Sequence, residues 1–179
     1  MTVIKYGSRF TKERFLLYIA ISVSFAFIAI SNGTTSWFIK AWTKKDVFGD
    51  EYHGLWKICY DRPNRGFDSS CFERVGDAFT NVVRFLLCLS FLCYAIILGY
   101  IIAMQFRADL TFNPVGVVLI TAALLALSGL ILFLASNDIP RVHWLFINKY
   151  GYSFGVGWAG MAIAMVSGII CISLPKVQY

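Results

Sequence analysis

Four long stretches without a charged side chain divide the sequence. They contain no Asp, Glu, Lys or Arg and consist mainly of aliphatic and aromatic residues: 15–39, 85–106, 110–137 and 150–175. Each exceeds the roughly 20 residues with which a helix crosses a bilayer. The pattern predicts one transmembrane domain, residues 1–179, with helices at about 15–35, 83–106, 113–135 and 152–174.

Two polar loops, residues 36–82 and 136–151, are predicted on one side of the membrane. The residues before the first helix are rich in positive charge, which is typical of a cytosolic flank: Lys5, Arg9, Lys12 and Arg14. We therefore expect a multi-pass protein of the plasma membrane with both termini cytosolic and both polar loops outside. A cleaved secretory signal is the alternative for the first stretch, but its apolar run is longer than a typical signal core of roughly 7–15 residues.

The composition excludes several classes of function. Only 15% of the residues are charged, and the net charge of +6 is dispersed among apolar stretches without a nucleic-acid-binding motif. No ionisable residue other than Arg84, at a boundary, is associated with the predicted helices, which disfavours a proton-coupled or active transporter. Neither histidine accompanies a recognisable nucleophile or phosphate-binding loop, so we expect no enzyme activity and no cofactor.

The two cysteines of the first loop, Cys59 and Cys71, are twelve positions apart. A solvent-accessible pair of this kind is expected to form a disulfide if the loop faces the secretory lumen, and to stay reduced in the cytosol. Zinc binding is the alternative, but no second pair or histidine cluster completes four ligands, so we predict no metal site. Cys171, near the inner end of the fourth helix, is a candidate for palmitoylation or a packed thiol.

The segment from Gly54 to Cys59, Gly-Leu-Trp-Lys-Ile-Cys, reads as a strand that enters a disulfide-linked sheet. Trp56 is then expected to rest at the lipid interface, as are Trp37 and Trp42 after the first helix. With four apolar stretches, Trp37, Gly54-Leu55-Trp56, Cys59 and Cys71 resemble the W…GLWxxC…C signature of the claudin superfamily. That group includes claudins, peripheral myelin and epithelial membrane proteins, and the gamma subunits of calcium channels.

The resemblance covers essentially the whole chain. Arg84 matches the family's arginine at the top of the second helix, and the Tyr-Gly-Tyr-Ser-Phe run 150–154 with Trp158 resembles the entry to the fourth. The resemblance implies a left-handed four-helix bundle with a small extracellular antiparallel sheet, four strands from the first loop and one from the second. Without it, Arg84 reads as a basic residue that snorkels to the interface.

Small residues recur at four-residue spacing on the fourth helix, in two rows: Gly151, Gly155, Ala159 and Gly160, Ala164, Gly168. Such rows permit close helix packing within the bundle, or a dimer interface.

Two functions are consistent with the family. The first is cell adhesion or a paracellular barrier, with self-association or related four-span proteins as partners at cell junctions. Its candidate contact residues are the aromatic side chains Phe48, Tyr52, Phe67, Trp144 and Phe146. The second is an auxiliary subunit that modulates an ion channel or receptor. The last residues, with Val177 and Tyr179, form a loose match to a PDZ ligand.

Overall fold

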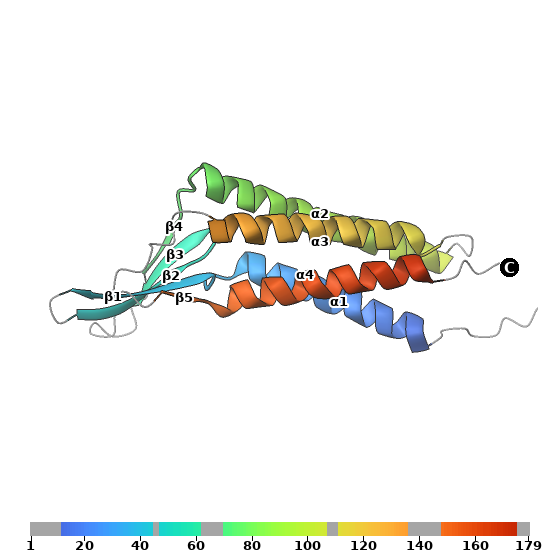
Figure 1. The fold of residues 1–179 in the computed structure, drawn as a ribbon, viewed down its shortest axis with the longest axis horizontal. Helices are drawn as coiled ribbons and strands as arrows, with labels where there is room; N and C mark the ends of the chain where they lie inside the picture. Colours follow the sequence, from blue (N-terminus) through green and yellow to red (C-terminus); the bar gives the residue numbers. More distant parts are fainter. Residues whose placement is uncertain (1–11, 45–46, 62–69, 107–110, 136–147, 175–179) are drawn as a thin grey trace, which may run out of the picture.

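The fold is a helical bundle with a sheet at one end (Figure 1). The computed structural model describes residues 12–44, 47–61, 70–106, 111–135 and 148–174. The helices are α1 (Lys12–Gly33), α2 (Ala78–Phe106), α3 (Asn113–Ala135) and α4 (Tyr152–Ser173). The strands are β1 (Phe38–Lys44), β2 (Val47–His53), β3 (Lys57–Asp61), β4 (Ser70–Glu73) and β5 (Asn148–Tyr150).

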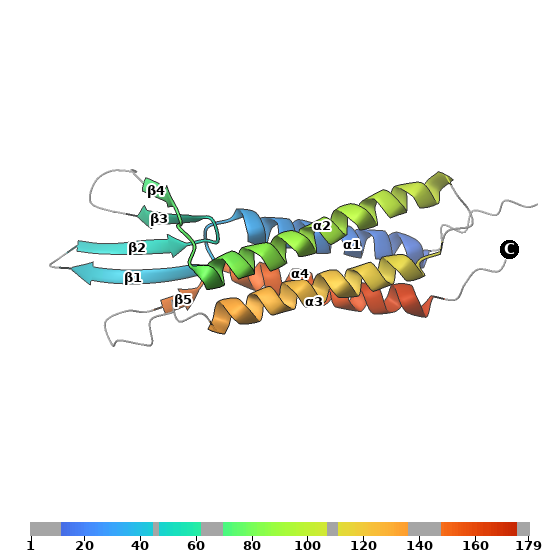
Figure 2. The same cartoon turned by 90° about the horizontal axis from the view of Figure 1, so that it is seen from above.

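The five strands form one antiparallel sheet in the order β4-β3-β2-β1-β5 (Figure 2). Strands β1 to β4 follow one another as a meander between α1 and α2, and β5 pairs with β1 from the segment between α3 and α4. The predicted architecture, four strands from the first loop and one from the second on a four-helix bundle, is confirmed. The sheet therefore joins the two halves of the chain.

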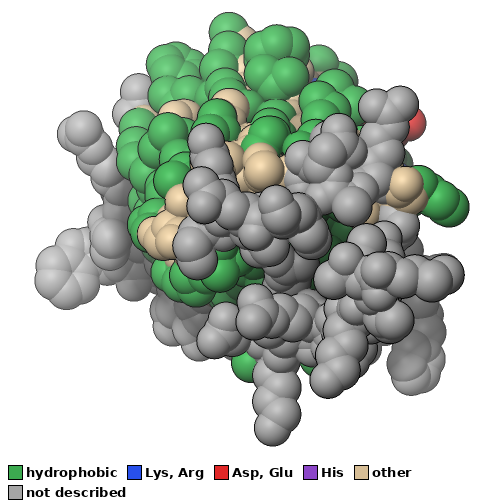
Figure 3. Space-filling model, turned by 90° about the vertical axis from the view of Figure 1, so that its right-hand side faces the viewer, with side chains coloured by type: hydrophobic (Ala, Val, Ile, Leu, Met, Phe, Trp, Pro, Cys, Tyr) green, Lys and Arg blue, Asp and Glu red, His purple; other side chains and the backbone are tan. Residues whose placement is uncertain are grey.

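All four helices are long and apolar enough to cross a membrane. In the bundle α4 packs against both α1 and α3, α3 packs against α2, and α1 touches α2 only slightly. Seen from the end opposite the sheet, hydrophobic side chains dominate the described surface (Figure 3). A surface of this kind is expected where lipid replaces water as the solvent.

Glycine brings α3 and α4 into backbone contact. A Cβ at Gly116 would lie 2.7 Å from the carbonyl oxygen of Gly168, and one at Gly168 would lie 3.0 Å from that of Gly116. Helices in lipid gain little from the hydrophobic effect and associate through such close packing.

Buried hydroxyl groups also connect the helices. Ser24 on α1 donates to the Gly160 carbonyl oxygen of α4 at 2.8 Å and accepts a hydrogen bond from the Tyr94 hydroxyl of α2. Ser90 on α2 donates to the Ala122 carbonyl oxygen of α3 at 2.9 Å. The two bonds of Ser24 thus link α1, α2 and α4, and the Ser90 bond links α2 to α3.

The second helix begins at Ala78, earlier than the transmembrane segment expected from about residue 83. Asp77 explains the difference, because its carboxylate accepts a hydrogen bond of 2.8 Å from the Thr80 backbone N–H and caps the helix. Hydrogen bonds from the Thr80 side chain and backbone lower the pKa of this carboxyl group. The cap thus lies in the polar segment that joins the sheet to the bundle.

Candidate functional site

The junction between the sheet and the bundle contains most of the motif residues. Gly54, Leu55 and Trp56 form a tight bend before β3, and the strand itself begins at Lys57. The prediction of a strand from Gly54 was therefore wrong at its start. The Gly54 N–H donates to the Lys57 carbonyl oxygen at 2.9 Å, and a bend closed by this bond cannot continue as an extended strand.

Each residue of the bend has a distinct environment. A Cβ at Gly54 would lie 2.6 Å from the Thr35 Cα atom, so only glycine lets the bend rest against the end of α1. The Leu55 side chain is fully buried, whereas Trp56 is 43% exposed. Leu55 thus anchors the bend in the core of the bundle, whereas the Trp56 indole remains partly exposed on the surface.

Arg84 clamps this bend to α2. Its Nε donates to the Leu55 carbonyl oxygen at 2.8 Å, and its Nη2 donates to the Arg74 carbonyl oxygen at 2.8 Å. Its Nη1 donates to Asn81 Oδ1 at 3.0 Å, and the guanidinium carbon lies 5.0 Å from the centroid of the Trp56 ring. The planar, five-donor guanidinium suits this arrangement, and simple snorkelling to the interface does not describe it.

Trp37 lies inside the protein and not at the lipid interface, so the prediction of an interfacial anchor was wrong for this residue. Its side chain is fully buried, and the indole N–H donates to the Ser31 carbonyl oxygen at the end of α1. The ring packs against Phe133 of α3 and Phe154 of α4, with centroid distances of 4.9 and 5.9 Å. Trp37 therefore joins three helices beneath the sheet; the side chain of Trp42 lies outside the described residues.

The entry to α4 approaches the end of α1 more closely than any side chain would allow. Gly151 N–H donates to the Trp37 carbonyl oxygen at 3.0 Å, and Ser153 N–H donates to the Ser36 carbonyl oxygen at 3.2 Å. A Cβ at Gly151 would lie 1.9 Å from that same Ser36 oxygen. The Thr34 hydroxyl also donates to the Ser153 hydroxyl at 2.5 Å.

A disulfide joins Cys59 and Cys71, which lie directly opposite each other on β3 and β4. The pairing expected for an oxidising compartment is confirmed. Beside it the Tyr60 and Phe72 rings are in contact across the same two strands, with centroids 6.1 Å apart. The disulfide therefore holds the edge strand β4, which has only four residues, on the sheet.

We expect Cys59→Ser to loosen β4 without removing the helices. A disulfide that closes a loop of this length contributes about 2–3 kcal/mol, largely by restricting the unfolded chain. Limited proteolysis of the protein in mild detergent should then cleave the segment between β3 and α2 at least about tenfold faster. Cys88→Ser, which removes a free exposed thiol of α2, is the control. Equal cleavage of both variants would contradict the prediction.

The predicted contact residues fall on several parts of the chain. Tyr52 lies on β2 and is half-buried. Phe48 lies on β2, but its side chain is not described, and Phe67, Trp144 and Phe146 lie outside the described residues. The structure adds three exposed apolar residues that sequence reasoning missed: Phe72 (60% exposed), Val75 (96%) and Phe79 (52%).

The two small-residue rows of α4 have different positions. Gly160, Ala164 and Gly168 are buried in the bundle, whereas Gly155 and Ala159 are exposed on its outer surface. A Cβ at Gly155 would meet nothing within 4 Å.

Cys171 is fully buried, with its Cβ 2.9 Å from where a Cβ of Gly116 would stand. Its thiol is thus packed against α3, and palmitoylation of Cys171 stays an untested prediction. Val177 and Tyr179, the PDZ-ligand candidates, lie outside the described residues.

Titratable side chains are sparse in the described part of the chain. Glu51 and His53 share a face of β2, with His53 Nε2 3.1 Å from Glu51 Oε2. Among the described residues no group of three or more His, Cys, Asp or Glu side chains is placed to hold a metal ion. The hydrogen bonds of Arg84 and the close backbone approach at Gly151 hold the sheet in place on the bundle.

The chain matches a known protein family. A family model described as PMP-22/EMP/MP20/Claudin matches residues 14–171, which run from near the start of α1 to near the end of α4 and include the whole sheet. No curated protein matches the chain.

Proposed function

Because the chain belongs to the PMP-22/EMP/MP20/Claudin family, we propose that it is a non-catalytic plasma-membrane protein that organises cell contacts or a paracellular barrier through its sheet. In this proposal the sheet faces the outside and both termini face the cytosol. The Cys59–Cys71 disulfide supports that orientation, since such bonds persist in oxidising compartments.

Exposed apolar side chains at the β4 edge are the observation that carries the proposal. Phe72 lies on the disulfide-linked edge strand β4, Val75 lies in the connection to α2, and Phe79 lies in the first turn of α2. Large apolar side chains exposed outside the apolar stretches are candidates for protein or membrane contact. The disulfide and the Arg84 clamp hold this surface in position, so a partner need not order it on binding.

Aggregation of non-adherent cells tests the proposal. Cells that express the protein should cluster, and the double variant Phe72→Ser with Val75→Ser should reduce clustering about tenfold or more at equal surface amount, as expected for interface anchors. Glu73→Gln, an exposed polar change on the same strand, is the control. Wild-type protein displayed at the surface without any clustering would refute the adhesion role.

An auxiliary subunit of an ion channel or receptor is the alternative, and the exposed Gly155 and Ala159 of α4 favour it. A flat small-residue surface lets a transmembrane helix of another protein approach closely. Purification in mild detergent separates the two proposals: stoichiometric recovery of a channel or receptor would replace adhesion as the primary role. A PDZ scaffold that binds Val177 and Tyr179 remains a proposal for either function.

A further inference from the structure

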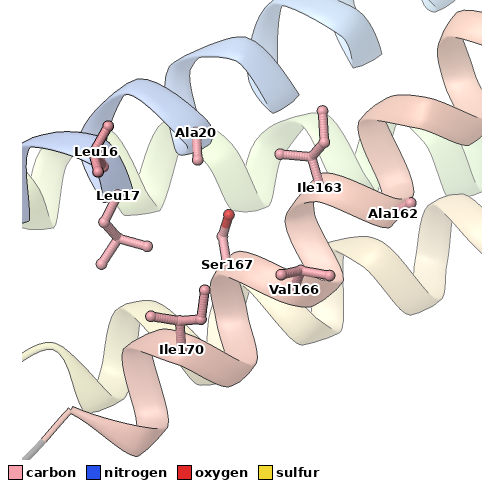
Figure 4. A pocket seen from close by; sticks show the side chains of 8 residues that line it. All are labelled: Leu16, Leu17, Ala20, Ala162, Ile163, Val166, Ser167 and Ile170. Carbon is pink, nitrogen blue, oxygen red and sulfur yellow. The ribbon is translucent and has the colours of Figure 1, made fainter. Parts of the chain in front are cut away.

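An apolar groove lies between α1 and α4 in the half of the bundle away from the sheet (Figure 4). Its volume is about 560 Å³. Seven of its eight lining side chains are aliphatic, and the eighth, Ser167, points from α4 toward α1: Leu16, Leu17, Ala20, Ala162, Ile163, Val166, Ser167 and Ile170. Small side chains, Ala20 and Ala162, leave the space between the larger ones.

The groove lies within the transmembrane part of both helices. In a bilayer its surroundings are hydrocarbon, so water does not fill it. From Ala162 to Ile170 it follows α4 over eight residue-to-residue steps, or about 12 Å of helix. That length is close to the roughly 15 Å thickness of hydrocarbon in one leaflet, which is half of a 30 Å core.

Two basic residues stand in the first turn of α1, the helix that contributes Leu16, Leu17 and Ala20 to the groove. Lys12, the first residue of α1, precedes Leu16 by four positions and Ala20 by eight, so helical periodicity places these three positions on one face. Arg14 follows within the same turn, and one acidic residue, Glu13, separates the two. A lipid that enters the groove with its chain toward the bilayer centre therefore has its headgroup at a basic helix end.

We propose that this groove holds one acyl chain of an anionic phospholipid from the leaflet opposite the sheet. The aliphatic lining binds the chain, and Lys12 and Arg14 select the charged headgroup. In the proposed orientation this is the cytosolic leaflet, where anionic lipids are concentrated. The inference goes beyond the role of the sheet and holds for either proposed function, because it concerns the opposite end of the bundle.

Native mass spectrometry in mild detergent, with equimolar palmitoyl-oleoyl phosphatidylserine and phosphatidylcholine, tests the site. Wild-type protein should retain one phosphatidylserine at least about fivefold more often than phosphatidylcholine, since one basic residue near an anionic lipid contributes about that factor. Ala162→Phe fills the groove and should remove retention of both lipids. Lys12→Gln with Arg14→Gln should remove the preference and leave equal retention.

Matched controls separate these effects from changes elsewhere. Ala95→Phe adds the same ring to an exposed position of α2, and Lys57→Gln removes a positive charge from the sheet; both should behave as wild type. Ala162 is exposed to lipid, and the smaller change Ala162→Leu, which should halve retention or more, repeats the test with less risk to folding. Each variant must elute as a single species before its lipid retention is compared with that of the wild type.

Three outcomes would overturn the proposal. The first is equal retention of both phospholipids by wild-type protein. The second is displacement of phosphatidylserine by cholesterol, which would assign the groove to a sterol. The third is a lipid-free dimer that Ala162→Phe dissociates, which would assign the groove to a second copy of the chain.

Discussion

Gly151→Ala is expected to abolish delivery of folded protein to the cell surface. The added Cβ would lie 1.9 Å from the Ser36 carbonyl oxygen and 2.5 Å from its carbonyl carbon. Both are backbone atoms held by the bonds of Trp37 and Ser153, so no side-chain rotation relieves the overlap. The backbone of Gly151 has φ −80° and ψ 167°, which alanine adopts readily, so the effect is steric contact and not conformational strain.

The expected loss is at least roughly 4 kcal/mol, the range that marks a severe local clash. Surface biotinylation and thermal unfolding in mild detergent measure it. Gly155→Ala, one turn further along α4, is the matched control because nothing lies within 4 Å of its Cβ. That variant should stay within about 1 kcal/mol of wild type, in the direction of greater stability. Similar behaviour of the two variants would show that the close approach at Ser36 does not matter.

Arg84→Met should detach the Gly54-Leu55-Trp56 bend from α2. The substitution removes hydrogen bonds to the carbonyl oxygens of Leu55 and Arg74 and leaves the first of these beside a fully buried side chain. Hydrogen bonds from a charged donor contribute about 1.5–3 kcal/mol each, and we expect a total loss of roughly 4 kcal/mol. Thermal unfolding in mild detergent measures it, with Lys57→Met as the control.

Arg84→Lys decides between a clamp and a snorkelling cation. An ammonium group reaches the interface as well as a guanidinium does, but it lacks the fork that spans two carbonyl groups. If the clamp is the role, the lysine variant should recover less than half of the loss seen with methionine. Full recovery by lysine would support the snorkelling interpretation and contradict the clamp.

The overall architecture could be predicted from the sequence because helices that cross a bilayer must be long and apolar. Four charge-free stretches identify the helices, and a cysteine pair in a polar loop indicates the disulfide. The fifth strand was predicted from the resemblance to the family, because the three residues of β5 are too few to give a strand pattern of their own. The start of α2 was missed because Thr80 and Asn81 read as loop residues, whereas the Asp77 cap extends the helix beyond the apolar stretch.

The side-chain environments at the junction between sheet and bundle could not be predicted from the sequence. Trp37 sits at a boundary where tryptophan ordinarily faces lipid, and only its bond to Ser31 and the Phe133 and Phe154 rings reveal that it is buried. Glycine rows gave the same sequence signal for Gly151 and Gly155, although one contacts backbone and the other faces outward. These distinctions depend largely on contacts between residues that are far apart in the sequence, such as Trp37 with Phe154 and Gly151 with Ser36.

Because β5 follows α3 in the chain and pairs with β1, the sheet is completed late in biosynthesis. Strands β1 to β4 and both disulfide cysteines precede α2, so they are complete before α3 and α4 emerge from the ribosome. From Cys71 to Ser153 the ribosome needs roughly 4–16 s at 5–20 residues per second. During that interval the carbonyl oxygens of Trp37 and Ser36 lack their hydrogen-bond donors, the N–H groups of Gly151 and Ser153. The nascent chain thus exposes the unpaired edge of β1 until β5 and α4 have been synthesised.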